Sequence, residues 1–209
     1  MQGYMETAST ESDGDASIHW SGIVVASSTN SVLTVSTQQE AGGGNVVVTP
    51  GFAGSIYIQK LPAVGVIALS GNYLNGTTGM NFNNSNASSS RFNVPLAYDS
   101  SSYTHSSTTN SHQITVTASG DYFLTYNGAF TGGTARTNNR ITVTVGGATT
   151  TGAQTKSNYI RNQNGHAEAS GNLVFLLEGV TAGQIISVQS QQEATAGQVS
   201  STTPGTLLL

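Results

Sequence analysis

Short runs of apolar residues at every second position restrict this chain to β structure. The apolar positions of Ile114–Ala118 and Ile141–Val145 alternate with threonine, and Ile56–Ile58 and Ile185–Val188 are further apolar runs. Successive side chains of a strand point to opposite faces, so this period of two places the apolar set on one face and threonine on the other. No stretch shows a sustained helical period. The pattern therefore predicts strands with one buried face and one solvated threonine face.

Clusters of glycine, asparagine and threonine separate these runs and predict turns. Thr131–Thr134, Gly146–Gly147 and Asn162–Gly165 are such clusters. Many short strands at a spacing of about ten residues, divided by glycine-rich turns, are typical of an antiparallel sandwich or barrel. The sequence therefore predicts an all-β fold.

The composition excludes several classes of protein. Only 8% of the 209 residues are charged, and the net charge is -4 with six Lys and Arg in total. Nucleic-acid binding by phosphate neutralisation needs a basic patch, which so few cations cannot build. The lack of cysteine excludes disulfides and thiolate metal sites. No apolar run reaches the length of about 18 residues that a membrane span requires, and Met1–Tyr4 lacks the basic and apolar regions of a signal peptide.

One segment of the sequence occurs twice. Ser31–Thr49 aligns with Gln184–Thr202, and the string Gln-Gln-Glu-Ala at Gln38–Ala41 recurs at Gln191–Ala194. The string is polar and specific, so a chance alternation of strand residues does not explain it. The repeat indicates that two parts of the chain share one fold.

The repeat also predicts an incomplete N-terminal unit, because residues 1–61 match only the second half of the later unit. We therefore divide the chain into a partial repeat at 1–61, a linker and polar loop at 62–91, and a near-complete repeat at 92–209. A half sandwich exposes strand edges and an uncovered apolar face. Either another subunit supplies the missing strands, or the chain is a window cut from a longer tandem protein.

The near-complete repeat resembles the globular head shared by complement C-one-q and tumour necrosis factor superfamily proteins. The resemblance covers most of 92–209, returns for the second half in 1–61, and is closest to the bacterial and phage versions. It rests on Tyr98-Asp99, His105, Ile114–Ala118, Gly120–Phe123, Arg140–Gly147, Leu173–Leu177 and Gly183–Val188.

The resemblance implies an antiparallel jelly-roll sandwich of ten strands, present here as one near-complete copy and a half copy. It further implies compact trimers that serve in binding, adhesion or architecture rather than catalysis. The chain departs from the family at Gln184, where the family commonly has Asp, and at Gly146, where it has Asn. These departures argue against a family metal site.

The residues offer little for catalysis or metal binding. The four histidines are not spaced as metal ligands, no Gly-x-Ser-x-Gly turn is present, and carboxylates are few. Asp13-Gly14-Asp15 fits either part of a calcium loop or a plain turn, and the missing remainder of the loop pattern favours the turn. We therefore expect no enzyme, no catalytic residue and no cofactor, with calcium as the alternative. The histidines are His19, His105, His112 and His166.

Large aromatic side chains at strand positions are candidates for the core or a subunit interface. In one strand, Tyr122 and Tyr126 share a face while Phe123 points to the other. We therefore expect both faces to be covered, one by the sandwich and one by a neighbouring subunit. The candidates are Trp20, Tyr122, Phe123, Tyr126, Phe130 and Phe175.

These features predict a structural, self-assembling protein. It would be a homo-oligomeric subunit of an extracellular filament, fibre or surface assembly of tandem jelly rolls, joined by strand complementation between subunits. The low charge favours this hypothesis, because few charges must be desolvated or repel when copies meet. The alternative is a trimeric head of an adhesin or phage tail fibre that binds a cell-surface glycan or receptor. We expect an extracellular, cell-surface or virion location, no nucleic-acid partner and no membrane insertion.

Overall fold

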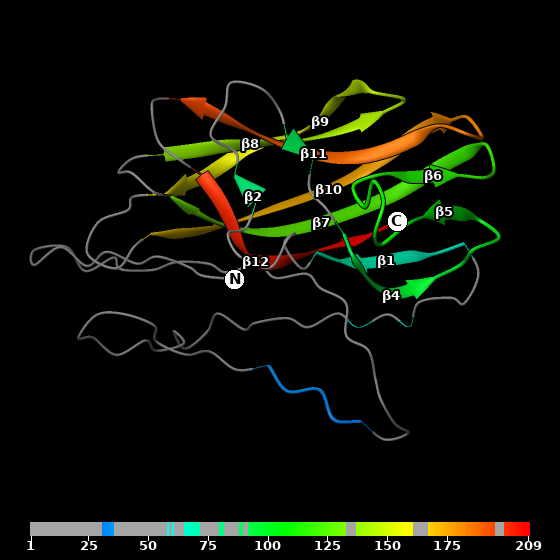
Figure 1. Cartoon of the computed structure of the whole chain (residues 1–209), viewed down its shortest axis with the longest axis horizontal. Helices are drawn as coiled ribbons and strands as arrows, with labels where there is room; N and C mark the ends of the chain where they lie inside the picture. The colour runs from blue at the N-terminus through cyan, green and yellow to red at the C-terminus, as the bar shows by residue number, and fades with distance from the viewer. Residues whose placement is uncertain are drawn as a thin grey trace, which may run out of the picture.

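The computed structural model describes residues 31–35, 58, 60, 65–71, 80–81, 88–89, 92–132, 137–160, 167–194 and 199–209. Within these ranges the regular secondary structure is entirely β (Figure 1). The strands are β1 (Ile67–Ser70), β2 (Met80–Asn81), β3 (Ser88–Ser89), β4 (Val94–Tyr98), β5 (Tyr103–His105), β6 (Ile114–Val116), β7 (Gly120–Gly132), β8 (Thr137–Val145), β9 (Ala148–Ile160), β10 (Glu168–Val180), β11 (Ile185–Ala194) and β12 (Val199–Leu208).

The strands form two antiparallel sheets. Sheet A has the order β10-β7-β12-β1-β4, with β2 also paired to β12, and sheet B has the order β5-β6-β11-β8-β9, with β3 also paired to β11 (Figure 1). In each sheet a late strand lies between two early ones: β12 separates β7 from β1, and β11 separates β6 from β8. Such crossings between two packed sheets are the mark of a jelly roll. The predicted all-β, antiparallel jelly-roll sandwich is confirmed.

The core lies between the two sheets and follows the expected alternation. On β7, Leu124, Tyr126 and Phe130 are no more than 2% exposed, and on β8 Ile141 and Val143 are fully buried. Burial of each such side chain contributes about 1.5–3 kcal/mol to folding. These inward positions hold the two sheets face to face.

The prediction of solvated threonines is wrong for β8. Thr142 is 8% exposed and Thr144 is 3% exposed, although both point away from the core positions Ile141 and Val143. The Thr144 hydroxyl donates a 3.4 Å hydrogen bond to the carbonyl of Ser187 on the neighbouring strand. A hydroxyl with such an acceptor can be buried at little cost.

The segment 62–91, predicted as a linker and polar loop, contains a central strand of sheet A. β1 lies between β12 and β4, and its side chains Ile67 and Leu69 are fully buried in the core. The short run Val66–Leu69 is wholly apolar, and burying it completes the inner face of the sheet. The folded domain therefore includes β1 and does not begin at residue 92.

Most of the predicted partial repeat lies outside the described residues, as do Trp20, His19 and Asp13–Asp15. The described residues 31–35 carry no strand and are exposed, with Val32 at 89%, whereas their repeat counterparts enter β11 at Ile185. The partial repeat and strand complementation therefore stay predictions.

Candidate functional site

The outward face of sheet A carries an apolar cluster, which we call the outer patch. Phe123 is 57% exposed, Val174 46% and Leu176 48%. Phe123 on β7 pairs with Leu176 on β10. Thr125, two residues further along β7, pairs with Val174 on β10 and with Leu208 on β12. The five side chains therefore adjoin. Their strand neighbours Leu124 and Leu173 are buried in the core, so the patch faces away from the sandwich. The outer patch thus consists of Phe123, Thr125, Val174, Leu176 and Leu208.

A row of amides borders the outer patch. Asn127 lies two residues beyond Thr125 on β7, and its side-chain oxygen accepts a 2.6 Å hydrogen bond from the Asn172 amide. Thr206 pairs with Asn127 from the other side. The outward surface of β10, β7 and β12 therefore passes from apolar to uncharged polar residues.

The predicted aromatic residues fall into three places. Tyr126 and Phe130 are core residues, Tyr122 and Phe175 are partly buried against that core, and Phe123 lies in the outer patch. Trp20 lies outside the described residues. An interface role for any of them stays a prediction.

The residues of the outer patch on β10 were missed in the sequence. Val174 and Leu176 alternate with Leu173, Phe175 and Leu177, so this strand is apolar on both faces. A strand with two apolar faces predicts cover on both sides. The unbroken apolar run Leu173–Leu177 carries this signal in the sequence. Its outward residues Val174 and Leu176 lie on the same surface as Phe123.

A second polar cluster joins the beginning of β1 to the loop between β4 and β5. The Asp99 carboxylate accepts hydrogen bonds from the Gly65 backbone N–H at 2.7 Å and from the Ser101 and Ser102 hydroxyls at 2.6 Å each. The Gly65 bond, followed by the bonds from the two serines, holds the pKa of Asp99 well below its usual range. The carboxylate therefore stays ionised while it fixes Gly65.

Tyr103 reinforces the same junction. Its hydroxyl donates a 3.1 Å hydrogen bond to the Gly65 carbonyl, and its ring meets Tyr122 edge-on with centroids 6.1 Å apart. Burial, followed by the nearby Tyr122 and Asp99, raises the pKa of Tyr103 to about 12. Gly65 is thus held through both its N–H and its carbonyl.

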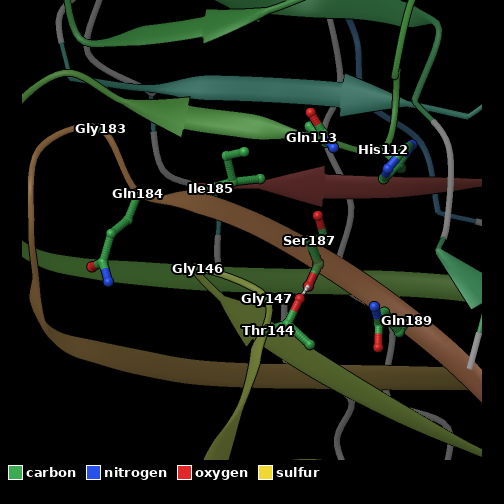
Figure 2. A pocket seen from close by; sticks show the side chains of 10 residues that line it. All are labelled: His112, Gln113, Thr144, Gly146, Gly147, Gly183, Gln184, Ile185, Ser187 and Gln189. Carbon is green, nitrogen blue, oxygen red and sulfur yellow. Dashed lines mark hydrogen bonds between the residues drawn. The ribbon is translucent and has the colours of Figure 1, made fainter.

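A pocket of about 450 Å³ lies on the outward face of sheet B (Figure 2). Its floor is formed by Thr144 of β8 and Ser187 of β11, which are register partners. Figure 2 shows Gln184 on one side of this pair, Gln189 on another, and Gln113 with His112 on the side of β6. The described residues that line it are His112, Gln113, Thr144, Gly146, Gly147, Gly183, Gln184, Ile185, Ser187 and Gln189.

The two positions at which the sequence departs from the family resemblance meet at this pocket. The Gln184 side-chain oxygen accepts a 2.8 Å hydrogen bond from the Thr181 N–H. Its amide nitrogen lies 3.3 Å from where a β-carbon would stand on Gly146, whose φ is +60°. Glycine at 146 therefore leaves room for the longer Gln184 side chain.

The histidines do not gather into a site within the described residues. The ring nitrogens of His105 lie 3.0 Å and 2.8 Å from the carbonyl oxygens of Gln113 and Phe92, so both are engaged by the backbone. His112 lines the pocket of sheet B, while His19 and His166 lie outside the described residues. Among the residues that the structure places, no three His, Cys, Asp or Glu side chains could hold a metal ion. The same part of the chain contains no helix that could cross a membrane.

Comparison with known proteins gives matches among solved structures alone. No protein-family model matches the sequence, and no curated protein matches it. The solved structures include murine APRIL at pH 5.0, with 14% identity over 69% of this chain and 99% of that chain at a TM-score of 0.39. Murine APRIL at pH 8.5 matches over the same shares with 13% identity and a TM-score of 0.35. The jelly-roll assignment rests on the strand order and register described above.

Proposed function

We propose that this protein is a structural jelly-roll subunit that assembles with copies of itself through the outer patch of sheet A. The assembly would be an extracellular fibre, filament or surface layer. The observation that carries the proposal is the outer patch itself, with Phe123, Val174 and Leu176 each about half exposed and adjoining. Contiguous exposed apolar surface on a folded protein commonly marks an interaction site.

The chemistry of the outer patch favours a second copy over an unlike partner. Its five residues are uncharged, and so are Asn127 and Asn172 beside them. Two copies of one patch that meet about a symmetry axis form a closed contact, so growth into a fibre also needs a second contact, which the predicted N-terminal strand complementation would supply. Apolar groups can meet their own kind, and amides both donate and accept hydrogen bonds, whereas like charges would repel. Only 8% of all residues are charged, so repulsion between copies is weak over the whole chain as well.

A charge placed in the outer patch tests this proposal. Leu176→Asp should abolish assembly, because a carboxylate would be desolvated and would face its own copies. Gln154→Asp is the control, because Gln154 is exposed on β9 in the other sheet. Sedimentation and negative-stain images should show assemblies for the wild type and the control, and single subunits for Leu176→Asp. Assembly by Leu176→Asp, or a wild type that stays monomeric at high concentration, would overturn the proposal.

Negative-stain images also separate the two forms of assembly. Regular rows without added ligand would support a filament or layer, and a discrete ring of subunits would support a head-like oligomer. A discrete particle would be consistent with the outer patch as the interface and would contradict the filament or layer.

A further inference from the structure

We propose that the pocket on the outward face of sheet B binds a neutral saccharide. This inference goes beyond self-assembly and does not depend on it, because the pocket and the outer patch lie on different sheets. The alternative function drawn from the sequence, a glycan-binding head, gains a specific location if the inference holds.

Several segments far apart in the sequence converge on the pocket (Figure 2). Strands β8 and β11 supply the floor through Thr144 and Ser187. The segment before β6 supplies His112 and Gln113, and the turn before β11 supplies Gln184. The volume of about 450 Å³ lies within the range of roughly 300–1,000 Å³ that is usual for small-molecule sites.

The described lining combines polar groups with apolar surface and carries no fixed charge. Among the described residues, no Asp, Glu, Lys or Arg lines the pocket. An ion or a phosphorylated ligand would therefore be desolvated without an opposite charge to pair with it. A ligand with several hydroxyl groups fits instead, since amides and hydroxyls can each donate and accept hydrogen bonds. The polar side chains that line the pocket and are more than slightly exposed are Gln113, Gln184, Gln189 and His112, whereas Thr144 and Ser187 in the floor are almost buried.

Part of the lining is already oriented. The Thr181 N–H fixes the side-chain oxygen of Gln184, which turns its amide N–H₂ group toward Gly146 in the pocket wall. The backbone of Gln113 is held by Asn110 through its N–H and by His105 at its carbonyl. The Gln184 amide, whose side-chain oxygen is fixed, therefore loses little conformational entropy when a ligand binds, and the backbone that carries Gln113 is fixed as well.

Two further features suit a sugar ring. Half-buried Ile185 is the aliphatic side chain among the described lining residues, and it can contact the C–H face of a pyranose. Gly147 and Gly183 have φ values of +83° and +86°, and a β-carbon on either would meet nothing within 4 Å. The rim is therefore open at these turns, which leaves room for a glycan chain to continue out of the pocket.

The described lining has no aromatic ring, so the affinity for one sugar should be low. We expect a Kd on the order of 1 mM for a single site. An array of subunits would raise the effective affinity for a multivalent surface, because the second contact becomes intramolecular.

Saturation-transfer difference NMR on the intact chain tests the inference, because it detects weak binding to assemblies of any size. The probes are the methyl glycosides of glucose, galactose, mannose, fucose and N-acetylglucosamine. Glucuronate and glucose 6-phosphate are charged controls of similar shape. At least one neutral glycoside should give a saturable signal that exceeds the signals of both charged sugars.

Matched variants locate the binding. Gln113→Ala with Gln189→Ala should weaken the Kd at least tenfold, and Gln154→Ala, an exposed glutamine on β9 outside the pocket, should leave it unchanged. If the double variant loses its β-sheet circular dichroism, Gln189→Glu replaces it, because an isosteric carboxylate should also weaken binding of a neutral ligand. No neutral signal, equal signals from charged sugars, or an unchanged Kd in the folded pocket variants would overturn the inference.

Discussion

Phe123 on β7 lies opposite Leu176 on β10, and both side chains point away from the core with 57% and 48% of their surface exposed. The next residue along β7, Leu124, is fully buried. One strand therefore presents apolar side chains to the core and to the outside in turn. Folding and the proposed assembly depend on different residues of the same strand, so the two can be separated by substitution.

The same substitution at two positions of β7 should affect different properties, mainly stability at one and assembly at the other. Phe130→Ala removes a fully buried ring and should lower the free energy of unfolding by about 3–5 kcal/mol. Phe123→Ala should lower it by about 1 kcal/mol or less, because the ring is half exposed, yet it should weaken assembly. Urea unfolding of dilute protein, followed by circular dichroism, measures the first effect, and sedimentation measures the second. Equal losses of stability at the two positions would contradict the assignment of Phe123 to the outer face.

The bonds that Asp99 accepts predict a loss of stability in acid. The pKa of Asp99 is depressed in the folded protein, so its contribution to stability is complete above the unfolded value of about 3.9. That contribution is lost as the pH falls through the lower folded pKa. Thermal melts should show a steeper drop below pH 4, at about the usual aspartate pKa, in the wild type than in Asp99→Asn. Ser102→Ala removes one donor and should give an intermediate slope, whereas identical slopes in all three proteins would refute the role of Asp99.

Tyr103 predicts the opposite behaviour in alkali. Its folded pKa of about 12 exceeds the usual tyrosine value of about 10, so the protonated phenol is favoured in the fold. The resulting stability is present below pH 10, about the unfolded value, and is lost as the pH rises through the folded value. Tyr103→Phe should cost about 0.5–1.5 kcal/mol at neutral pH, because the hydrogen bond to Gly65 is removed. In this variant the melting temperature should also fall less steeply as the pH rises above about 10. If it falls as steeply as in the wild type, other groups cause the loss of stability in alkali.

The sequence predicted the strands with strong alternation and missed those whose role depends on distant partners. Ile114 and Val116, like Ile141 and Val143, are buried as expected because alternation is a local property. β1 was missed because its four residues show no alternation. Only the pairing with β12 and β4 makes it a central strand.

The pocket of sheet B could not be found from the sequence for a related reason. Gln113, Gln189 and Thr144 lie far apart in the chain, and no motif links them. They meet only because β11 is placed between β6 and β8, which is a property of the whole jelly roll. The sequence predicts only part of the outer patch. It places Phe123 on a face that a neighbouring subunit covers, but it does not single out Val174, Leu176 and Leu208.

A deletion of residues 1–61 tests whether the predicted partial repeat joins one subunit to the next. The remaining chain keeps Gly65, β1 and every other strand of the two sheets, so 62–209 should retain its β-sheet circular dichroism and its cooperative melt. If the N-terminal segment completes a neighbouring subunit, this variant should no longer form regular rows in negative stain. A deletion of residues 1–71 is the matched control, because it also removes Ile67 and Leu69 from the core and should abolish the cooperative melt. Normal rows from 62–209 would show that strand complementation is wrong and that residues 62–209 supply the contact that extends the row beyond the outer patch.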